Sequence, residues 1–197
     1  MTDDTGEDLM ARMAGGDREA FALLYRRHRS DVYRFAAHFC GSLAQAEDIV
    51  QDVFLAVIQH AARYRPERSA VLPWLLGIAR NYSRRRRSER PMLPLPVDDT
   101  PSARELSIDL DPLAGITRDR QAVALRRALG ELPGRYREAI VLCDLHDLTY
   151  LDAASVLGCA VGTVRSRLHR GRALLARRLS DSEQPVTPRL PATRAVL

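Results

Sequence analysis

The stretch TYLDAASVLGCAVGTVRSRLHRGRALL, residues 149–175, decides the fold of the C-terminal half. Thr149 can cap a helix that ends at Gly158, and glycine readily adopts the left-handed turn between two helices. The next helix carries one apolar stripe, made of Val161, Val164, Leu168 and Leu175. A short helix, a glycine turn and a second helix with a polar outer face predict a helix–turn–helix motif.

The outer face of this second helix predicts contact with DNA. It consists of Thr163, Arg165, Ser166, Arg167, His169 and Arg170. Arginine can pair with two acceptors on a guanine edge or bind a phosphate, and phosphate contacts outnumber base contacts in such interfaces. The alternative is a helical hairpin with a solvated arginine face, but residues 161–180 hold six arginines and no acid. Without an anionic partner, that face would repel itself.

A second basic block lies earlier in the chain. Residues 61–90 hold nine arginines against two acids, a net charge of +7, whereas the net charge of all 197 residues is only +5. Every one of the 30 basic residues is arginine, because the sequence contains no lysine. Two separate basic blocks predict two contacts with a polyanion.

Aromatic residues interrupt this earlier block. Tyr64, Trp74 and Tyr82 alternate with the arginines, and residues 64–73 contain two prolines that predict a loop before a helix starting near Trp74. Basic groups with aromatic rings suit single-stranded nucleic acid, because the charge contacts the backbone and the rings accept unstacked bases. Trp74 itself also fits a core position beside Leu75 and Ile78.

The helix before this loop has two distinct faces. Its apolar stripe follows the helical period through Ala46, Ile49, Val50, Val53, Phe54, Val57, Ile58 and Ala61. The opposite face carries Asp48, Asp52, Leu55 and Gln59. An apolar side chain among polar ones is compatible with a protein interface, although spacing alone also fits a solvated face with one stray leucine.

These patterns predict an all-α protein with two small helical domains joined by a flexible acidic linker. Residues 91–116 contain five prolines and five acids with no apolar period. The predicted divisions are an extension (1–16), a first domain (17–90), the linker (91–117), a second domain (118–179) and a disordered tail (180–197).

Two stretches together resemble a known family. AEDIVQDVF (46–54) and WLLGIARN (74–81) look like region 2 of bacterial RNA polymerase sigma factors, in the extracytoplasmic-function (ECF) group. LPGRYREAIVLCDLHDLTYLDAASVLGCAVGTVRSRLHRGRALL (132–175) is similar to region 4 of the same group. The likeness covers about residues 17–90 and 118–179, in the family's order.

The resemblance implies a role for each surface. The face with Asp48, Gln51, Asp52 and Leu55 would dock on the β′ clamp of core polymerase, and the second domain would meet the β flap. The −10 promoter element would be melted and held by Tyr64, Arg65, Arg80, Asn81, Arg84 and Arg85. Asn81 stands at the family position that recognises an extruded base, while the arginines from Arg84 to Arg87 suit phosphate. The helix carrying Thr163 to Arg170 would read the −35 element.

Some residues depart from the family pattern. Ala160 stands where a capping residue often begins the recognition helix, so the cap is weaker. His169 and the loop from Tyr64 to Val71 are individual to this sequence. The −35 and −10 sequence preferences therefore cannot be transferred from relatives.

Composition also bears on the compartment, on metal or cofactor binding and on the class of protein. Cys40, Cys143 and Cys159 are consistent with reduced cytoplasmic thiols, and we expect no metal site, cofactor, membrane insertion or enzymatic activity. The resemblance implies core polymerase and promoter DNA as partners, with an anti-sigma factor as a further one. Two alternatives stay open: an ordinary regulator that binds duplex DNA without polymerase, and a helical interaction protein with incidental basic blocks.

Overall fold

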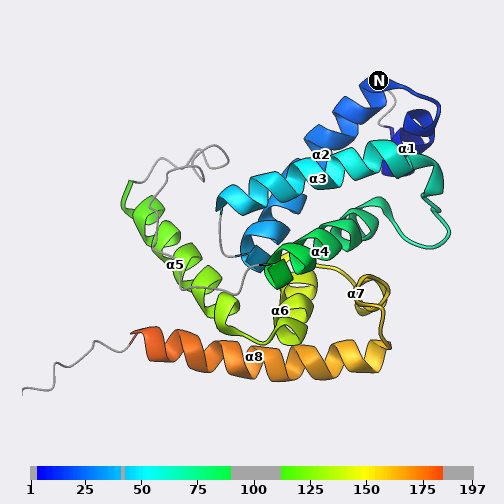
Figure 1. The fold of residues 1–197 in the computed structure, drawn as a ribbon. Coiled ribbons are helices and arrows are strands. Elements are labelled where there is room, and N and C mark those ends of the chain that lie inside the picture. Colours follow the sequence, from blue (N-terminus) through cyan, green and yellow to red (C-terminus); the bar gives the residue numbers. More distant parts are fainter. Residues whose placement is uncertain (1–3, 41–42, 90–111, 184–197) are drawn as a thin grey trace, which may run out of the picture.

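The structure is a computed structural model that describes residues 4–40, 43–89 and 112–183 (Figure 1). All regular elements within these ranges are helical, which confirms the predicted all-α class. The first domain comprises α1 (Gly6–Ala14), α2 (Arg18–Cys40), α3 (Leu43–His60), the short 3-10 helix η1 (Ala61–Arg63) and α4 (Val71–Glu89). The second comprises α5 (Pro112–Glu131), α6 (Gly134–Ile140), the π-helical turn η3 (Val141–Leu145), α7 (Tyr150–Leu157) and α8 (Val161–Glu183).

The first domain is a bundle in which α2, α3 and α4 pack on one another. The carboxylate of Asp17 accepts hydrogen bonds from the backbone amides of Glu19 and Ala20, so it caps α2. Phe35 and Ile49 are fully buried at the centre of the bundle. Their burial explains why the apolar stripes of these helices follow the helical period.

The bundle begins earlier than the sequence predicted. Residues 6–14 form α1, whereas the sequence assigned residues 1–16 to an extension. Thr5 and Asp8 form a reciprocal capping box at its start, and the side chains of Leu9 and Met10 are almost completely buried. Burial of these two large apolar side chains away from water stabilises the packing of α1 on α2.

Helix α4 also begins before the predicted position. It starts at Val71 rather than near Trp74, with Pro73 in its first turn. Proline is tolerated there because the first backbone amides of a helix have no partner within the helix. Trp74 is partly buried against the core, as its apolar neighbours indicated.

The second domain contains the predicted helix–turn–helix. Thr149 caps α7 by accepting a 3.1 Å hydrogen bond from the amide of Asp152. Gly158 ends α7 in the left-handed region, with φ 64° and ψ 43°. Helix α8 then begins at Val161, so Ala160 is the uncapped residue before it. The predicted turn and the helix that follows it are therefore confirmed.

Helix α8 lies along one whole side of the molecule, beneath α5, α6 and α7 (Figure 1). Its close approach to α6 occurs at Gly171. A Cβ atom added there would lie 3.0 Å from Cδ1 of Ile140 and 3.2 Å from Cβ of Tyr136. Gly171 therefore lets the recognition helix pack directly on α6.

The two domains, which the sequence predicted to be joined by a linker, also pack against each other. Helix α2 contacts α5 and η3, α4 contacts α7, and one continuous set of buried apolar residues runs through both domains. The predicted linker lies outside the described residues up to position 111, and α5 begins at Pro112, six positions before the predicted start of the second domain at residue 118. Helix α8 extends to Glu183, and the rest of the predicted tail is outside the described residues.

None of the helices in the described ranges combines the length and the apolar character that crossing a membrane requires.

Candidate nucleic-acid interface

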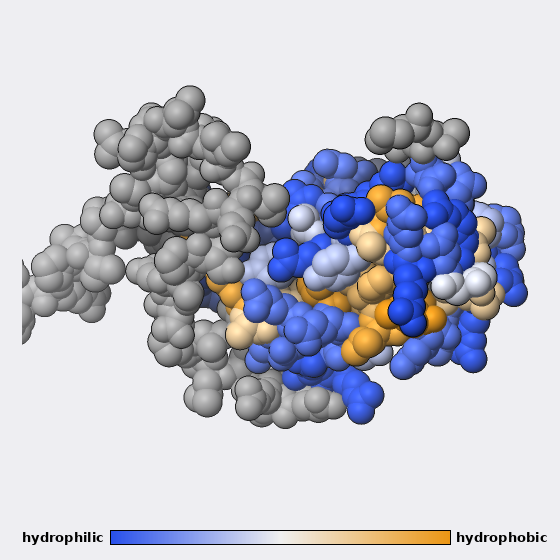
Figure 2. Space-filling view, turned by 90° about the horizontal axis from the view of Figure 1, so that it is seen from above, coloured by the Kyte–Doolittle hydropathy of each residue, from blue (hydrophilic) through white to orange (hydrophobic). Residues whose placement is uncertain are grey.

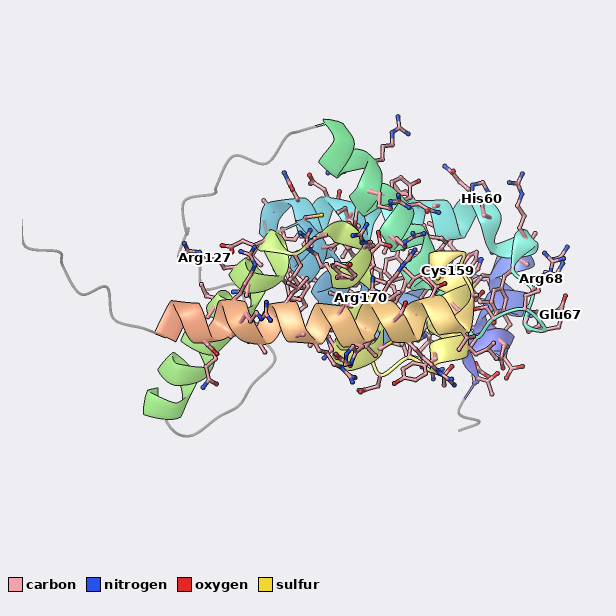
Figure 3. The ribbon with its side chains drawn as sticks, turned by 90° about the horizontal axis from the view of Figure 1, so that it is seen from below. His60, Glu67, Arg68, Arg127, Cys159 and Arg170 are labelled. Carbon is pink, nitrogen blue, oxygen red and sulfur yellow. The ribbon has the colours of Figure 1, made fainter. Side chains whose placement is uncertain are left out.

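The predicted DNA-reading face of α8 is largely exposed. Arg165, Ser166, His169 and Arg170 are exposed, whereas Thr163 and Arg167 are half-buried. Helix α8 crosses the lower face of the molecule with Arg170 near its middle (Figure 3). Val164 and Leu168 are buried beneath this face, as the stripe predicted.

Two arginines of α8 have neighbours that orient them. The guanidinium of Arg165 lies over the ring of Tyr150, 5.7 Å from its centroid. A cation over an aromatic face is attracted by the ring, so Tyr150 holds Arg165 at the start of the recognition helix. Arg167 instead points towards the turn, with Nη1 3.8 Å from Sγ of Cys159.

Arg170 belongs to a small polar cluster with α6. Hydrogen bonds from Arg135 and then Arg170 lower the pKa of the Tyr136 hydroxyl. The guanidinium of Arg135 also lies 4.7 Å from the centroid of the Tyr136 ring. Arg135 and Tyr136 therefore extend the basic surface of α8 onto α6, which the sequence did not predict.

Helix α4 separates the predicted −10 residues into two groups. Asn81, Arg84 and Arg85 are exposed. Arg80 is not, since only 12% of its side chain is accessible. Its Nε donates to Oε2 of Glu138 at 3.0 Å, and its Nη1 donates to the carbonyl of Val156 at 3.2 Å.

Tyr64 does not present its ring for stacking, contrary to its predicted −10 role. It is buried, lies edge-on to Trp74 at 5.4 Å and donates a 2.9 Å hydrogen bond to the carbonyl of Ser69. Burial raises the pKa of its hydroxyl. Tyr64 therefore closes the loop between α3 and α4, while Arg65 stays exposed and donates to the carbonyls of Ala62 and Tyr64.

The predicted docking face of α3 is present on the surface. Gln51 and Asp48 are exposed, Asp52 is half-buried, and 57% of Leu55 is accessible. Ile58 was predicted to be in the buried stripe, but 55% of it is accessible. The apolar stripe winds gradually around α3. Near the end of the helix it therefore leaves the core, and Ile58 lies on the exposed side next to Leu55, which is one helical turn before it.

An apolar hollow of about 270 Å³ lies on this face. Phe21, Gln51, Phe54, Leu55 and Ile58 line it. Figure 2 shows hydrophobic surface gathered among hydrophilic surroundings on the side of the molecule where α2 and α3 lie. Such a patch bordered by polar residues is typical of a protein-binding surface.

The acids of this face already have a partner. Arg86 of α4 donates to Oδ2 of Asp48 at 2.7 Å and to Oδ2 of Asp52 at 2.6 Å. Burial opposes a charged Arg86, but its hydrogen bonds to both carboxylates raise its pKa overall. One arginine thus joins the basic end of α4 to the docking face of α3.

A pocket of about 520 Å³ opens between the two domains. It is lined by four arginines, Arg80, Arg84, Arg135 and Arg167, and by the carboxylate of Glu138. Arg80 and Arg84 come from α4, whereas Arg167 comes from α8. Arginines of both predicted DNA surfaces therefore face the same space.

Sequence reasoning treated Arg86 only as one of the phosphate contacts Arg84 to Arg87, and it did not single out Glu138. The only available signal for Glu138 was an acid directly before the apolar run 139–143. Within the described residues, no group of three or more acidic, histidine or cysteine side chains is arranged to hold a metal ion.

Comparisons with known proteins agree with this geometry. The family model for sigma-70 region 2 matches residues 24–90, and that for sigma-70 region 4 matches residues 122–175. The ECF sigma factor SigM of Mycobacterium tuberculosis is 36% identical over 87% of this chain and 83% of its own length. SigE of Mycolicibacterium smegmatis is 35% identical over 81% of this chain, which spans only 62% of that longer relative.

A solved structure matches both domains at once. It shows the sigma factor RpoE of Bartonella quintana in complex with the anti-sigma factor NepR. The TM-score is 0.63, with 28% identity, over 83% of this chain and 98% of that one. A match of that extent includes residues on both sides of the linker.

Proposed function

The chain belongs to the sigma-70 family of RNA polymerase sigma factors, in its ECF group, and on that premise we propose that it binds core RNA polymerase and directs it to promoters. It recognises the −35 and −10 elements and promotes strand opening. One observation carries this proposal. A single chain presents an arginine-bearing recognition helix and, separately, an apolar helix face bordered by acids.

The −35 contact is assigned to α8. Arg165, Ser166, His169 and Arg170 are accessible to the major groove, and Arg170 is supported by Tyr136. Guanidinium groups at the exposed face can read guanine or bind phosphate. Thr163 and Arg167 complete this surface at its inner edge.

The −10 contact is assigned to the exposed face of α4. The amide of Asn81 can pair with a base edge, and Arg84 and Arg85 can bind strand phosphates. Holding an unstacked base offsets the few kcal/mol that unpairing costs, so strand opening follows from binding without ATP. Arg65 extends this surface into the loop before α4.

Polymerase docking is assigned to the face of α3 around Leu55. Its apolar hollow and flanking acids suit a partner surface that combines aliphatic and basic side chains. A cytoplasmic location and the absence of an enzymatic reaction of its own follow from this role. An anti-sigma protein is a further proposed partner, because RpoE was solved with one.

In vitro transcription with purified core polymerase on a promoter library tests the proposal. Specific starts that depend on the added protein are expected. Duplex binding without a start at any promoter would instead favour an ordinary DNA-binding regulator. A protein without salt-dependent DNA affinity would be a helical interaction protein.

A matched pair of variants tests the docking face. Leu55→Asp should weaken core binding by roughly thirtyfold or more, as expected for a central apolar contact worth about 2 kcal/mol. Leu151→Asp is the control, because Leu151 is an exposed leucine of α7 away from α3. Equal losses in both variants would contradict the assignment of α3.

A further inference from the structure

Helix α1 contacts the loop of residues 64–70 at both of its ends. Before the loop, α1 packs on η1, whose last residue directly precedes the loop. After the loop, Gly6 of α1 lies against Val71, the buried first residue of α4, and a Cβ atom added at Gly6 would lie 3.0 Å from Cγ2 of Val71. Leu9 and Met10 fix α1 itself in the core. The loop therefore starts and ends on the same buried helix.

Tyr64 closes this loop on itself. Its hydroxyl donates a 2.9 Å hydrogen bond to the carbonyl of Ser69, and its ring lies edge-on to Trp74 at 5.4 Å. Burial, followed by the negative charges of Glu7 and Glu67, raises the pKa of the hydroxyl, so Tyr64 keeps the proton that it donates. Since Glu7 belongs to α1, this helix lies beside Tyr64 as well.

The closed loop presents two arginines differently. Nη1 of Arg65 donates to the carbonyls of Ala62 and Tyr64, so this side chain lies back on the start of the loop. The backbone amide of Arg68 donates to the carbonyl of Arg65 at 3.0 Å, which forms a turn. The guanidinium of Arg68 is exposed, has no acceptor among the residues that the structure describes, and lies at the end of the molecule where α1 lies (Figure 3). Its donors are available to a phosphate.

We propose that α1 and Tyr64 position the loop of residues 64–70 for the −10 strand, and that Arg68 is the phosphate contact which they hold in place. The proposal deepens and rests on the proposed function, because it needs the loop before α4 to meet the strand. A loop that is already ordered binds more tightly than a mobile one, because binding then costs less conformational entropy. Helix α1, which the sequence assigned to an extension, therefore takes part in promoter opening.

Tyr64→Phe tests the closure of the loop. Phenylalanine keeps the ring against Trp74 and removes only the hydroxyl that bonds Ser69. Tyr33→Phe is the matched control, because Tyr33 is a half-buried tyrosine of α2 on the side of Arg126 in α5.

Gly6→Ala tests the contact of α1 independently and covers the case in which Tyr64→Phe does not fold. The added Cβ meets Val71, which is buried and cannot turn away freely. Gly162→Ala is the control, since an added Cβ there meets no atom within 4 Å and Gly162 belongs to α8. Circular dichroism verifies that each variant is folded.

Hydrogen exchange measures the order of the loop without DNA. On the full chain, mass spectrometry of the peptide spanning residues 64–71 should show faster amide exchange in Tyr64→Phe and in Gly6→Ala, with both controls like wild type. Unchanged exchange in both variants would overturn the positioning role.

Strand binding is measured on the variants assembled with core polymerase. Fluorescence anisotropy with a single-stranded −10 oligonucleotide should show roughly fivefold weaker binding for Tyr64→Phe and Gly6→Ala, because the loop must then be ordered on binding. Affinity for a −35 duplex should stay unchanged, whereas general damage to the fold would lower both. Faster exchange of the loop with unchanged strand affinity overturns the proposal.

A double variant tests whether Tyr64 acts through Arg68. Arg68→Ala should weaken strand binding, and adding Tyr64→Phe should weaken it little further, because the contact to be positioned is already gone. Arg29→Ala, at an exposed arginine of α2, controls for the loss of one positive charge. Equal losses for Arg68→Ala and Arg29→Ala, or fully additive losses in the double variant, contradict the assignment of Arg68.

Transcription by the wild-type protein with core polymerase is assayed in parallel. If it initiates while the variants bind the strand as wild type does, the positioning role is wrong and the proposed function stands. If the wild-type protein neither binds the strand nor initiates although its loop exchanges slowly, the proposed function fails, and the positioning role fails with it.

Discussion

Arg137 in α6 donates a 3.1 Å hydrogen bond from Nη1 to the carbonyl oxygen of Phe39, 98 residues earlier at the end of α2. The same side chain is fully buried and donates to the carbonyls of Leu129, Gly130 and Leu132 at the end of α5. Its positive charge thus lies at two helix C-termini, where the helix dipole favours a cation.

Replacing Arg137 should destabilise the protein strongly. Arg137→Met leaves several buried carbonyls without donors, each costing about 1–3 kcal/mol, so we expect a loss of at least about 3 kcal/mol. Urea unfolding followed by circular dichroism measures it. Arg135→Met is the control, because Arg135 is exposed two residues away, and a similar loss there would contradict the explanation.

Replacing Arg86 should affect docking more than stability. Arg86, Asp48 and Asp52 are all partly accessible, so losing each of the two ion pairs costs only about 0–1 kcal/mol. Arg86→Gln leaves two uncompensated acids on the α3 face. The association rate with core polymerase at low salt should rise a few fold, as measured by stopped-flow fluorescence without DNA. A slower rate would mean that Arg86 positions these acids for docking.

Two glycines of the helix–turn–helix should respond in opposite directions to alanine. Gly158→Ala should destabilise by roughly 1–2 kcal/mol, because φ is +64° and an added Cβ meets no atom within 4 Å, so the cost is purely conformational. Gly162→Ala, within α8 and also unobstructed, should stabilise by about 0.5–1 kcal/mol. Thermal unfolding measures the stability of both variants. A change in the same direction for the two variants would contradict this explanation.

Acid should weaken the domain interface. Burial lowers the pKa of His38 and of His146 from 6.5 to about 4, and neither ring nitrogen of His146 has a hydrogen-bond partner within the described part of the chain. Arg126 and Arg34 near His38 add repulsion, while Asp31 and Asp147 near His146 partly offset the effect of Arg34. His146 also packs against Phe35 of α2, 5.9 Å between ring centroids.

The direction of the pH dependence of stability follows from proton binding by the two histidines. Between pH 6.5 and about 4 the unfolded chain protonates these histidines and the folded chain does not, so stability falls as pH falls. Each histidine contributes up to about 1.4 kcal/mol per pH unit in that window. Urea unfolding from pH 7 to 4.5 measures the slope. His146→Leu should reduce it, whereas His169→Gln, at an exposed position, should not.

Arg170→Ala should distinguish base reading from phosphate binding. If Arg170 reads a base, the variant loses about 1–3 kcal/mol on the preferred −35 sequence and discriminates less at one position. An equal loss on every duplex, with a shallower salt dependence, would identify a phosphate contact. Anisotropy titrations with single-base variants of the −35 element decide between the two.

Local patterns predicted the helix–turn–helix well. Thr149, Gly158 and the stripe through Val164 each act within a few residues, so their structural consequences can be read from adjacent letters. The same holds for the exposed acids and Leu55 on α3. The family resemblance added the order of the two domains and their roles.

Contacts between distant residues could not be read in this way. Arg80 and Glu138 are 58 positions apart in the sequence. The residues next to each of them in the sequence do not indicate that the two side chains pair. Tyr64 was assigned to a strand-binding surface from its residue type, but its burial depends on how the loop folds onto Trp74. Ile58 continues the apolar stripe of α3 but is exposed. A regular stripe does not reveal how far along a helix the neighbouring helices cover it.

The contact at Gly171 fixes α8 to α6, and α6 carries Glu138. Helix α8, which carries the predicted −35 residues, and the carboxylate that accepts from Arg80 therefore belong to one packed unit. A side chain larger than glycine at position 171 would push α8 away from α6, and this would change the spacing between the two predicted DNA surfaces.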